Sequence, residues 1–520
     1  MDFLALVLSL IIDASASWIR MFMALGISIL ISVVVGIYAA ISPRAEKLIL
    51  PVVDVLQTVP ILAFFPFALY VFVVLLPGYI GINAAVVFLI ITSMVWNIIL
   101  GVYESIKTVP KEFLEVSDLY HFNRIERLRK IYIPAALPRI VEQSILSWSI
   151  GLFYLVTSEI FSVGVMNDQV KYGIGVAFAS LAYQGWMPYL IGIVVFVCFV
   201  VATRFLFFMP LEKYSTRYMR QQSKVQPAAQ GYEKTVLNWI SRNIPKAPSI
   251  LSSNRIVRGR RNVSHIANPP MHPNFKILYY AVIALLIIGS LYILAANPIL
   301  LGYEYEVLPA LAFSFARIWF AFLVMLLVAV PVCIYLIFSS KQGSKYMLFF
   351  QIVASLPATI LLPAIAVTLH NGEIVAFVVF LLSGIWYLIF GIMASTRTLP
   401  NSIFEVQKIF GVKGKNAWKN IYIKAIIPGL ITGAITGIAA EWNASIVAEY
   451  FTTSGITGTT NIVSSIGIGL GKLLDLSLSS GGQGLGLMII ALINLVVMII
   501  LINTFVWKRF YKQIAKVYGG

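Results

Sequence analysis

A stretch that decides the fold of this chain occurs twice, as WNIILGVYESIKTVPKEFLEV at residues 96–116 and as WYLIFGIMASTRTLPNSIFEV at residues 386–406. The copies lie 290 residues apart and share Trp, Gly, Pro and Glu at the same positions. The same shift superposes two further pairs, Pro138 on Pro428 and Glu159 on Glu449. Upstream the shift becomes 297, and it places Arg20 on Arg317 and the pair Pro60/Pro66 on Pro357/Pro363. Because the repeat preserves spacing and polar residues, it indicates an internal duplication.

The composition around this repeat is that of a membrane protein. Of 520 residues, 60% are hydrophobic and only 11% are charged, whereas soluble domains carry roughly 25% charged residues. The two cysteines lie in apolar runs and the four histidines are scattered, so a disulfide framework or a metal site is not expected. The sequence therefore predicts an all-α polytopic membrane protein with no cofactor of its own.

Hydropathy predicts eleven membrane-spanning helices of about 20 residues. They are Trp18–Ala40, Val53–Leu76, Ile80–Gly101, Ile140–Ser162, Tyr189–Met209, Ile277–Ala296, Leu308–Ser339, Met347–Leu369, Ile374–Ala394, Leu430–Phe451 and Leu485–Val506. The apolar stretch Phe3–Ile12 is too short to cross alone, and we expect it to lie at the interface or to pack on a neighbour.

The distribution of cations gives the orientation. The polar segment Leu211–Pro273 holds eleven basic residues against two acids, out of a net charge of +17, and the positive-inside tendency places it in the cytoplasm. A polyanion could bind at Arg258–Arg261, but a solvated linker beside anionic lipid explains the charge better, so no nucleic-acid partner is expected. The N-terminus is then predicted outside, and the linker and C-terminus inside.

The duplication and the orientation together predict four parts. They are a first five-span repeat (1–212), a basic cytoplasmic linker (213–273), an extra transmembrane helix (274–303) and a second five-span repeat (304–520). Two repeats of the same orientation imply a pseudo-twofold axis along the membrane normal. The extra helix is needed because the linker is inside and the second repeat must begin outside.

The long cytoplasmic loop of each repeat, 104–139 and 397–429, is predicted to form two short helices joined by a turn. In the second loop, Glu405 is followed by Gly411 and, nine residues later, by Ile421. Such spacing resembles the signature loop of the permease subunits of ABC importers, which reads Glu-Ala-Ala, three residues, Gly, nine residues, Ile, one residue, Leu, Pro. Its last positions here are Ile423 and Lys424, and Pro428 follows.

The first loop shows the same pattern with Glu115, His121, Ile131 and Pro134, and Ser117 replaces an alanine. His121 occupies the position of the glycine, and either His121 or Asn123 is expected to take the left-handed turn. Ile125, Leu128 and Ile131/Tyr132 follow at helical spacing and predict an amphipathic second helix.

The resemblance covers both five-span cores. It implies a fused permease in the plasma membrane of a prokaryote, in which two cytoplasmic ATPase subunits dock on the two loops and a solute-binding protein delivers the substrate outside. ATP would be bound by the partner, since the chain contains no Gly-x-x-x-x-Gly-Lys-Ser/Thr loop. A narrower resemblance, carried by Gln57–Pro60, Ser355–Pro357 and Ala448-Glu449, points to the nitrate/sulfonate/taurine branch and to a small anionic or zwitterionic solute.

Polar residues within the spans are candidates for the substrate pathway, because ionisable groups are costly in the bilayer. Glu441, Trp442 and Asn443 lie deep in a predicted span. The matching positions of the first repeat are Gly151, Leu152 and Phe153. The alternative for Glu441 is a structural carboxyl bonded to a neighbouring helix, and an acid there suits a zwitterion better than a bare anion.

Two further pairs of charged residues lie near the outer ends of spans. Glu159 and Glu449 could form a gate or an interhelix hydrogen bond, although an interfacial carboxylate is the preferred interpretation. Arg20 and Arg317 are expected to extend to lipid headgroups rather than to bind an anion.

The proline pairs beginning at Pro60 and Pro357 break the second span of each repeat. We expect these spans to line the central interface, where protein can satisfy the freed backbone groups; simple kinks are the alternative.

Two other classes of protein remain as rivals. A secondary transporter driven by an ion gradient would also have duplicated halves, but it gives no reason for the repeated cytoplasmic loops. A membrane-embedded enzyme would need clustered His, Asp or Cys in the bilayer, which the sequence lacks.

Overall fold

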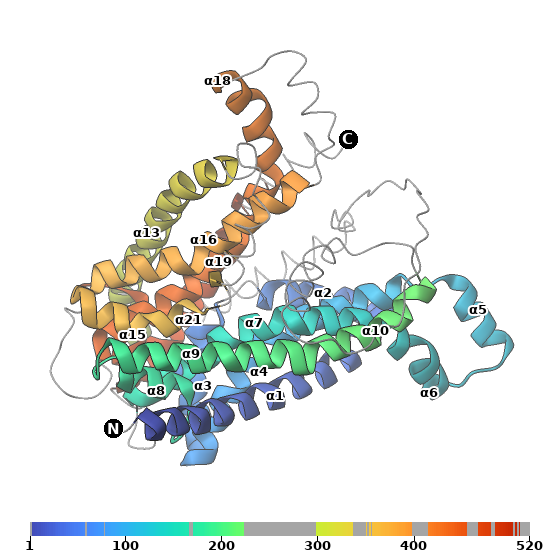
Figure 1. Ribbon diagram of the computed structural model, residues 1–520, viewed down its shortest axis with the longest axis horizontal. Helices are drawn as coiled ribbons and strands as arrows, with labels where there is room; N and C mark the ends of the chain where they lie inside the picture. The colour runs from blue at the N-terminus through green and yellow to red at the C-terminus, as the bar shows by residue number, and fades with distance from the viewer. Residues whose placement is uncertain are drawn as a thin grey trace, which may run out of the picture.

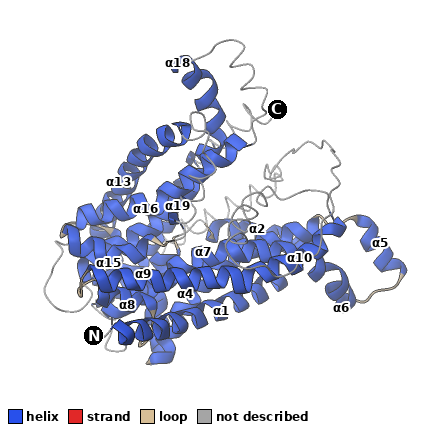
Figure 2. Cartoon of the chain, in the orientation of Figure 1, coloured by secondary structure: helices blue, strands red, loops and turns tan. Residues whose placement is uncertain are grey.

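The computed structural model describes residues 3–57, 60–76, 78–165, 170–222, 298–335, 350, 353–354, 356–397, 414–454, 466–479, 484–502, 505–506 and 509. Within these ranges the regular structure is helical and no β-strand occurs (Figure 2). The all-α prediction is therefore confirmed.

The first half is built from long helices joined by short elements. In chain order they are α1 (Phe3–Ile41), α2 (Pro43–Leu56), the 3₁₀ turn η1 (Ile61–Phe64), α3 (Phe65–Leu75), α4 (Tyr79–Lys107), α5 (Lys111–Leu119), α6 (Arg124–Arg127), the π turn η2 (Leu128–Tyr132), α7 (Ile133–Val165), α8 (Ile174–Leu181), α9 (Trp186–Thr203), the π turn η3 (Arg204–Phe208) and α10 (Met209–Gln222).

The second half repeats this order over its described residues. It contains α13 (Pro298–Ile334), α15 (Ala358–Leu369), α16 (Gly372–Arg397), α18 (Gly414–Ala417), the π turn η5 (Trp418–Tyr422), α19 (Ile423–Ser454), α20 (Leu470–Ser479) and α21 (Leu485–Ile502).

Eight helices in the described ranges are long and apolar enough to cross a membrane. The second span of each half is shorter, with apolar helices at Ile61–Phe72 and Ala358–Leu369. The predicted extra span Ile277–Ala296 lies outside the described residues, as does the linker beyond Gln222. Within the linker range, residues 213–222 continue α10 as a helix.

The first helix is longer than the predicted span. The stretch Phe3–Ile12 belongs to the 39-residue helix α1, and Leu6 and Leu10 are buried within the first half. It therefore packs on its neighbours, one of the two arrangements expected for it.

Proline breaks the second span of each half at equivalent points. Pro60 and Pro357 have extended backbone (ψ 111° and 133°) and stand immediately before η1 and α15. A proline has no backbone N–H and disfavours helical geometry in the preceding residue, so the helix restarts at each of them. Both prolines are buried in protein.

The two halves contact each other through these broken spans. In one direction, η1 contacts α19 and α3 contacts α20; in the other, α15 contacts α7 and α8. In Figure 1 the long helices of the two halves meet around α8, α9 and α15 and diverge toward the ends that carry α6 and α18. The contacts between the halves are thus reciprocal, as a pseudo-twofold arrangement requires.

Candidate functional site

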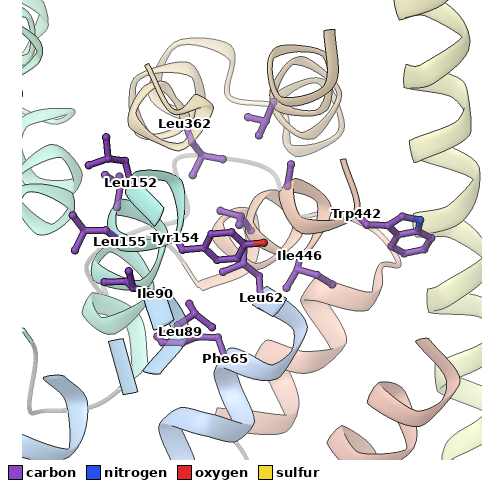
Figure 3. Packing of buried hydrophobic residues seen from close by; sticks show 14 of the residues in the cluster. Leu62, Phe65, Leu89, Ile90, Leu152, Tyr154, Leu155, Leu362, Trp442 and Ile446 are labelled. Carbon is purple, nitrogen blue, oxygen red and sulfur yellow. The ribbon is translucent and has the colours of Figure 1, made fainter. Parts of the chain in front are cut away.

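Apolar side chains fill the centre of the interface between the halves. Figure 3 shows Tyr154 of α7 directed toward Leu62 of η1 and Ile446 of α19, with Leu362 of α15 nearby. These four residues are at most 5% exposed. The centre is therefore closed by side chains from both halves.

Among the described residues, two hydrogen bonds cross this interface, and each reaches a broken span. The backbone N–H of Leu62, just after Pro60, donates to Asn443 Oδ1 of α19 at 3.4 Å. In the other direction, the Tyr189 hydroxyl of α9 donates to the backbone oxygen of Ile360 in α15. Backbone groups next to a break need partners inside a membrane, and here the opposite half supplies them.

Glu441 does not face that interface. It is fully buried, and its carboxyl lies beside Gly384 of α16, where a Cβ would be 3.0 Å from Oε1. The same Cβ would also meet Met325 of α13. Neither carboxyl oxygen has a hydrogen-bond partner among the described residues. Glu441 is therefore an isolated carboxyl between α13, α16 and α19 of its own half.

Trp442 likewise packs within the second half. It is 3% exposed, its ring centroid lies 6.5 Å from that of Phe315 in α13, and Figure 3 shows it directed away from Tyr154. Of the three neighbouring candidates, Asn443 alone contacts the other half through a hydrogen bond in the described ranges.

Glu159 belongs to a buried polar cluster in the first half, which we call the first cluster (Ser17, Arg20, Asn83 and Glu159). Glu159 Oε1 accepts hydrogen bonds from the Ser17 hydroxyl and from Arg20 Nη1, both at 2.7 Å. Arg20 Nε donates to Asn83 Oδ1 and Nη2 to the oxygen of Tyr172, again at 2.7 Å. The cluster joins α1, α4 and α7.

The second half repeats this arrangement in the second cluster (Ser314, Arg317, Glu373 and Glu449). Ser314 donates to Glu449 at 2.8 Å and Arg317 Nη1 donates to Glu449 at 3.2 Å. Arg317 also forms a bidentate pair with Glu373 at 2.6 Å and donates to the oxygen of Ile468. Glu373 stands where the first cluster has Asn83.

The preferred interpretations of these charged residues were wrong. Arg20 is 5% exposed and Glu159 and Glu449 are 0% exposed, and the Arg317 side chain is 16% exposed and paired with Glu373 and Glu449. The arginines therefore point into the protein rather than to headgroups, and the glutamates are not interfacial. The alternative of interhelix hydrogen bonds for the glutamates agrees with the geometry. In the sequence the arginine and the glutamate lie far apart, and a single charged residue is expected to be exposed. Once the helices pack, the two charges neutralise each other.

Sequence reasoning missed two members of each cluster. Ser17 and Ser314 each bridge a glutamate to the backbone N–H of the next short helix. The signal was present as a repeated Gly-x-Gly, Gly173–Gly175 and Gly469–Gly471, which spans the start of both helices at equivalent positions.

The loop at 104–139 forms an exposed helix, a turn and a second helix. In α5, Glu115 is exposed together with Phe113, Val116 and Leu119, whereas Ser117 is buried and donates to Leu114 O. An exposed apolar helix face of this kind is typical of a protein-binding surface.

The turn after α5 uses both candidate residues. His121 takes the left-handed conformation, at φ 51°. Asn123 instead begins α6 with a capping box, in which it exchanges hydrogen bonds with Glu126 at 2.8 and 3.0 Å. The two residues therefore divide the roles of turn and cap.

The second helix of the loop is not a separate element. From Arg124 it runs through η2 into α7 without interruption, and Ile131 and Tyr132 pack against the core. Pro134 is half-buried at the start of α7. The equivalent π turn η5 contains Ile421, and Pro428 lies in α19. Glu405 and Gly411 lie outside the described residues.

A polar link joins α2 to α4 in the first half. Glu46 accepts hydrogen bonds from the Tyr103 hydroxyl and from Lys107 Nζ, both at 2.6 Å. Partial burial raises the pKa of Glu46, but the bonds from Lys107 and Tyr103 outweigh it and leave this pKa below its ordinary value.

The fold and the paired clusters define a polytopic helical membrane protein made of two equivalent halves. The family of binding-protein-dependent transport system inner membrane components matches the chain twice, over residues 32–209 and 310–506. Because the two matches cover most of the chain, the chain belongs to this family. The predicted duplication and the resemblance to ABC importer permeases are confirmed.

Several permease proteins are similar to parts of this chain. The glycine betaine/proline betaine transport system permease protein ProW of Escherichia coli is 30% identical over 164 residues, 31% of this chain and 44% of ProW. The bicarbonate transport system permease protein CmpB of Synechococcus elongatus is 26% identical over 152 residues, 29% of this chain and 52% of CmpB.

The nitrate import permease protein NrtB of Leptolyngbya laminosa is 28% identical over 135 residues, 26% of this chain and 45% of NrtB. The chain thus spans about half the length of the curated relatives it matches. The solutes in the names of these relatives include both anions and zwitterions.

Proposed function

We propose that this chain supplies both halves of the translocation pathway of an ABC importer for a small anionic or zwitterionic solute. Two cytoplasmic ATPase subunits would dock on the loops at 104–139 and 397–429 and would bind the ATP. A solute-binding protein would deliver the solute at the opposite, outer face. The N-terminus would lie outside, and the linker and C-terminus inside.

The observation that carries this proposal is the reciprocal contact of the broken spans with the opposite half. Each break at Pro60 and Pro357 lies where the halves meet, and its backbone is bonded across the interface. Movement of one half against the other would break these bonds and open the path between Tyr154, Leu62 and Ile446. In this proposal Asn443 is the polar side chain that the solute passes.

The charges of the buried polar groups support the proposed class of solute. Arg20 and Arg317 are paired with buried glutamates, so neither offers a free cation to an anion. A neutral amide such as Asn443 can donate to a carboxylate, sulfonate or nitrate oxygen without a full charge. The relatives that carry nitrate, bicarbonate and glycine betaine support the same range of solutes.

Affinity purification tests the class of protein. The chain is purified from its native membrane beside a Glu115→Arg/Glu405→Arg double variant, with Glu112→Arg, an exposed residue on the same helix, as the control. An ATPase should elute with the parent and the control and be lost from the double variant. A folded parent without ATPase in several mild detergents would instead favour a transporter driven by an ion gradient.

Uptake by proteoliposomes that contain the complex and its binding protein then tests the solute. The panel is nitrate, bicarbonate, taurine and glycine betaine, each with and without ATP. ATP-dependent uptake of one of them is the expected result. Uptake that follows an imposed proton or sodium gradient without ATP would contradict the proposal.

A further inference from the structure

The two polar clusters fix the start of a short helix in each half. In the first half, the N–H of Ile174 donates to Ser17 Oγ at 2.9 Å and that of Gly175 to Glu159 Oε2 at 2.8 Å. In the second, the N–H of Leu470 donates to Ser314 Oγ and that of Gly471 to Glu449 Oε2, both at 2.9 Å. The first N–H groups of α8 and α20 are therefore satisfied by the clusters rather than by water.

The fit between cluster and helix start leaves no spare space. A Cβ at Gly173 would lie 2.8 Å from Glu159 Oε2, and one at Gly469 would lie 2.6 Å from Glu449 Oε2. Glycine is thus required for the close approach of backbone to carboxylate. Each short helix is held at a fixed distance from α1 or α13, the helices that carry the serine and the arginine.

Each short helix in turn contacts the opposite half. The first-half helix α8 contacts α15, and the second-half helix α20 contacts α3. The chain of contacts from each cluster through its short helix to the opposite half, which we call the crossed route, therefore spans the interface. Glu159 is tied to α8, which packs on the second half, and Glu449 is tied to α20, which packs on the first.

We propose that the two clusters position α8 and α20 so that each closes the interface on the broken span of the opposite half. Glu159, Glu449 and their arginines are then positioning residues for this closure. That the closure matters for passage of a solute rests on the proposed function, whereas the crossed route itself does not. It concerns residues outside the docking loops and outside the central apolar contact.

The crossed route can be tested with cysteine reporters at equivalent positions. Phe65 of the first half and Leu362 of the second half are 2% and 0% exposed, and both belong to helices that contact the opposite half and to the buried cluster in Figure 3. Each is replaced by cysteine in a Cys198→Ser/Cys333→Ser background, which removes both native thiols. Ile98→Cys and Leu388→Cys, buried inside α4 and α16, serve as controls for general loosening.

Labelling by a charged maleimide is measured on the full chain in lipid nanodiscs with its native partners retained. Glu159→Gln should speed labelling at the Leu362 reporter and Glu449→Gln at the Phe65 reporter. An increase of about tenfold is expected when one charge-assisted hydrogen bond that favours the closed arrangement is lost. Glu306→Gln, which removes an exposed carboxyl of α13 outside both clusters, should change neither reporter.

Faster labelling only in the half that carries the substitution would overturn the proposal. So would an equal increase at the two interface reporters and the two buried controls, since that pattern reports general unfolding. Unchanged labelling in both variants would also overturn it. The measurement needs neither solute nor nucleotide, so a failure of the transport assays would leave its result intact.

Discussion

In the first half, Met94 of α4 fills the space opposite Gly151 of α7, and a Cβ on that glycine would lie 2.3 Å from Met94 Cε. In the second half the equivalent residues are Gly384 and Glu441, so the small residue and the large one have exchanged helices. The volume at this corner is kept while its polarity changes. By contrast, the Ser–Arg–Glu clusters are nearly the same in both halves.

This difference separates two kinds of constraint on a duplicated chain. A buried ion pair tolerates no single change, because removing one partner leaves an uncompensated charge. At the corner of Met94 and Gly151 it is mainly the volume that is kept, since its second-half counterpart is formed by Gly384 and Glu441. The Ser, Arg and Glu of the clusters have therefore stayed alike in the two halves, whereas this corner has diverged.

The largest expected effect is a loss of stability that differs between the two clusters. Glu159→Ala leaves Arg20 buried without a carboxylate and should lower stability by about 3–5 kcal/mol. Glu449→Ala should have a smaller effect, because Arg317 keeps its bidentate pair with Glu373. Thermal unfolding of the purified chain, followed by size-exclusion chromatography, measures both. Equal losses of stability in the two variants would contradict the inferred difference between the clusters. Adding Glu373→Gln to Glu449→Ala should bring its loss of stability up to that of Glu159→Ala.

A second comparison concerns how closely the helices approach. A Cβ at Gly433 of α19 would lie 2.6 Å from the backbone oxygen of Tyr387 in α16, and small residues allow such contact between membrane helices. Gly433→Ala should therefore force these helices apart and lower stability by about 1–3 kcal/mol. The equivalent Gln143→Ala in α7 should have a smaller effect, which the same unfolding assay will show. A tolerated Gly433→Ala would mean that this backbone contact is looser than described.

The third comparison separates two neighbouring candidates for the pathway. Asn443→Leu removes the amide at the interface between the halves and should lower the initial uptake rate about tenfold, equivalent to one hydrogen bond of about 1.4 kcal/mol. Glu441→Gln changes a carboxyl that faces its own half, so its uptake should match that of the parent. The reverse ranking in the proteoliposome assay would return Glu441 to the pathway.

The smallest expected effect concerns the polar link between α2 and α4. The pKa of Glu46 is lowered in the folded chain, so its contribution is present above the unfolded pKa of about 4.3 and is lost as pH falls through the folded value. Glu46→Gln should reduce stability at neutral pH by under about 1 kcal/mol and match the parent at low pH. Unfolding curves at the two pH values, with Glu104→Gln as control, measure the difference. A deficit that persists in acid would contradict a charge-based role.

The sequence by itself determined the class of fold, the duplication and the points at which the second spans break. These follow from local properties: apolar length, repeated spacing, and the missing N–H of proline at Pro60 and Pro357. The turn at His121 and Asn123 was also predictable, since both residue types favour that geometry.

The tertiary structure alone decided which charges meet and which faces point at the other half. Arg20 and Glu159 are 139 residues apart, and their mutual neutralisation depends on helices brought together by packing. Glu441 and Asn443 are two residues apart on α19, yet they face different neighbours because successive side chains point in different directions around a helix. Which side chains are buried, and which partners they bond to, depends on how the helices pack together and cannot be read from any single helix.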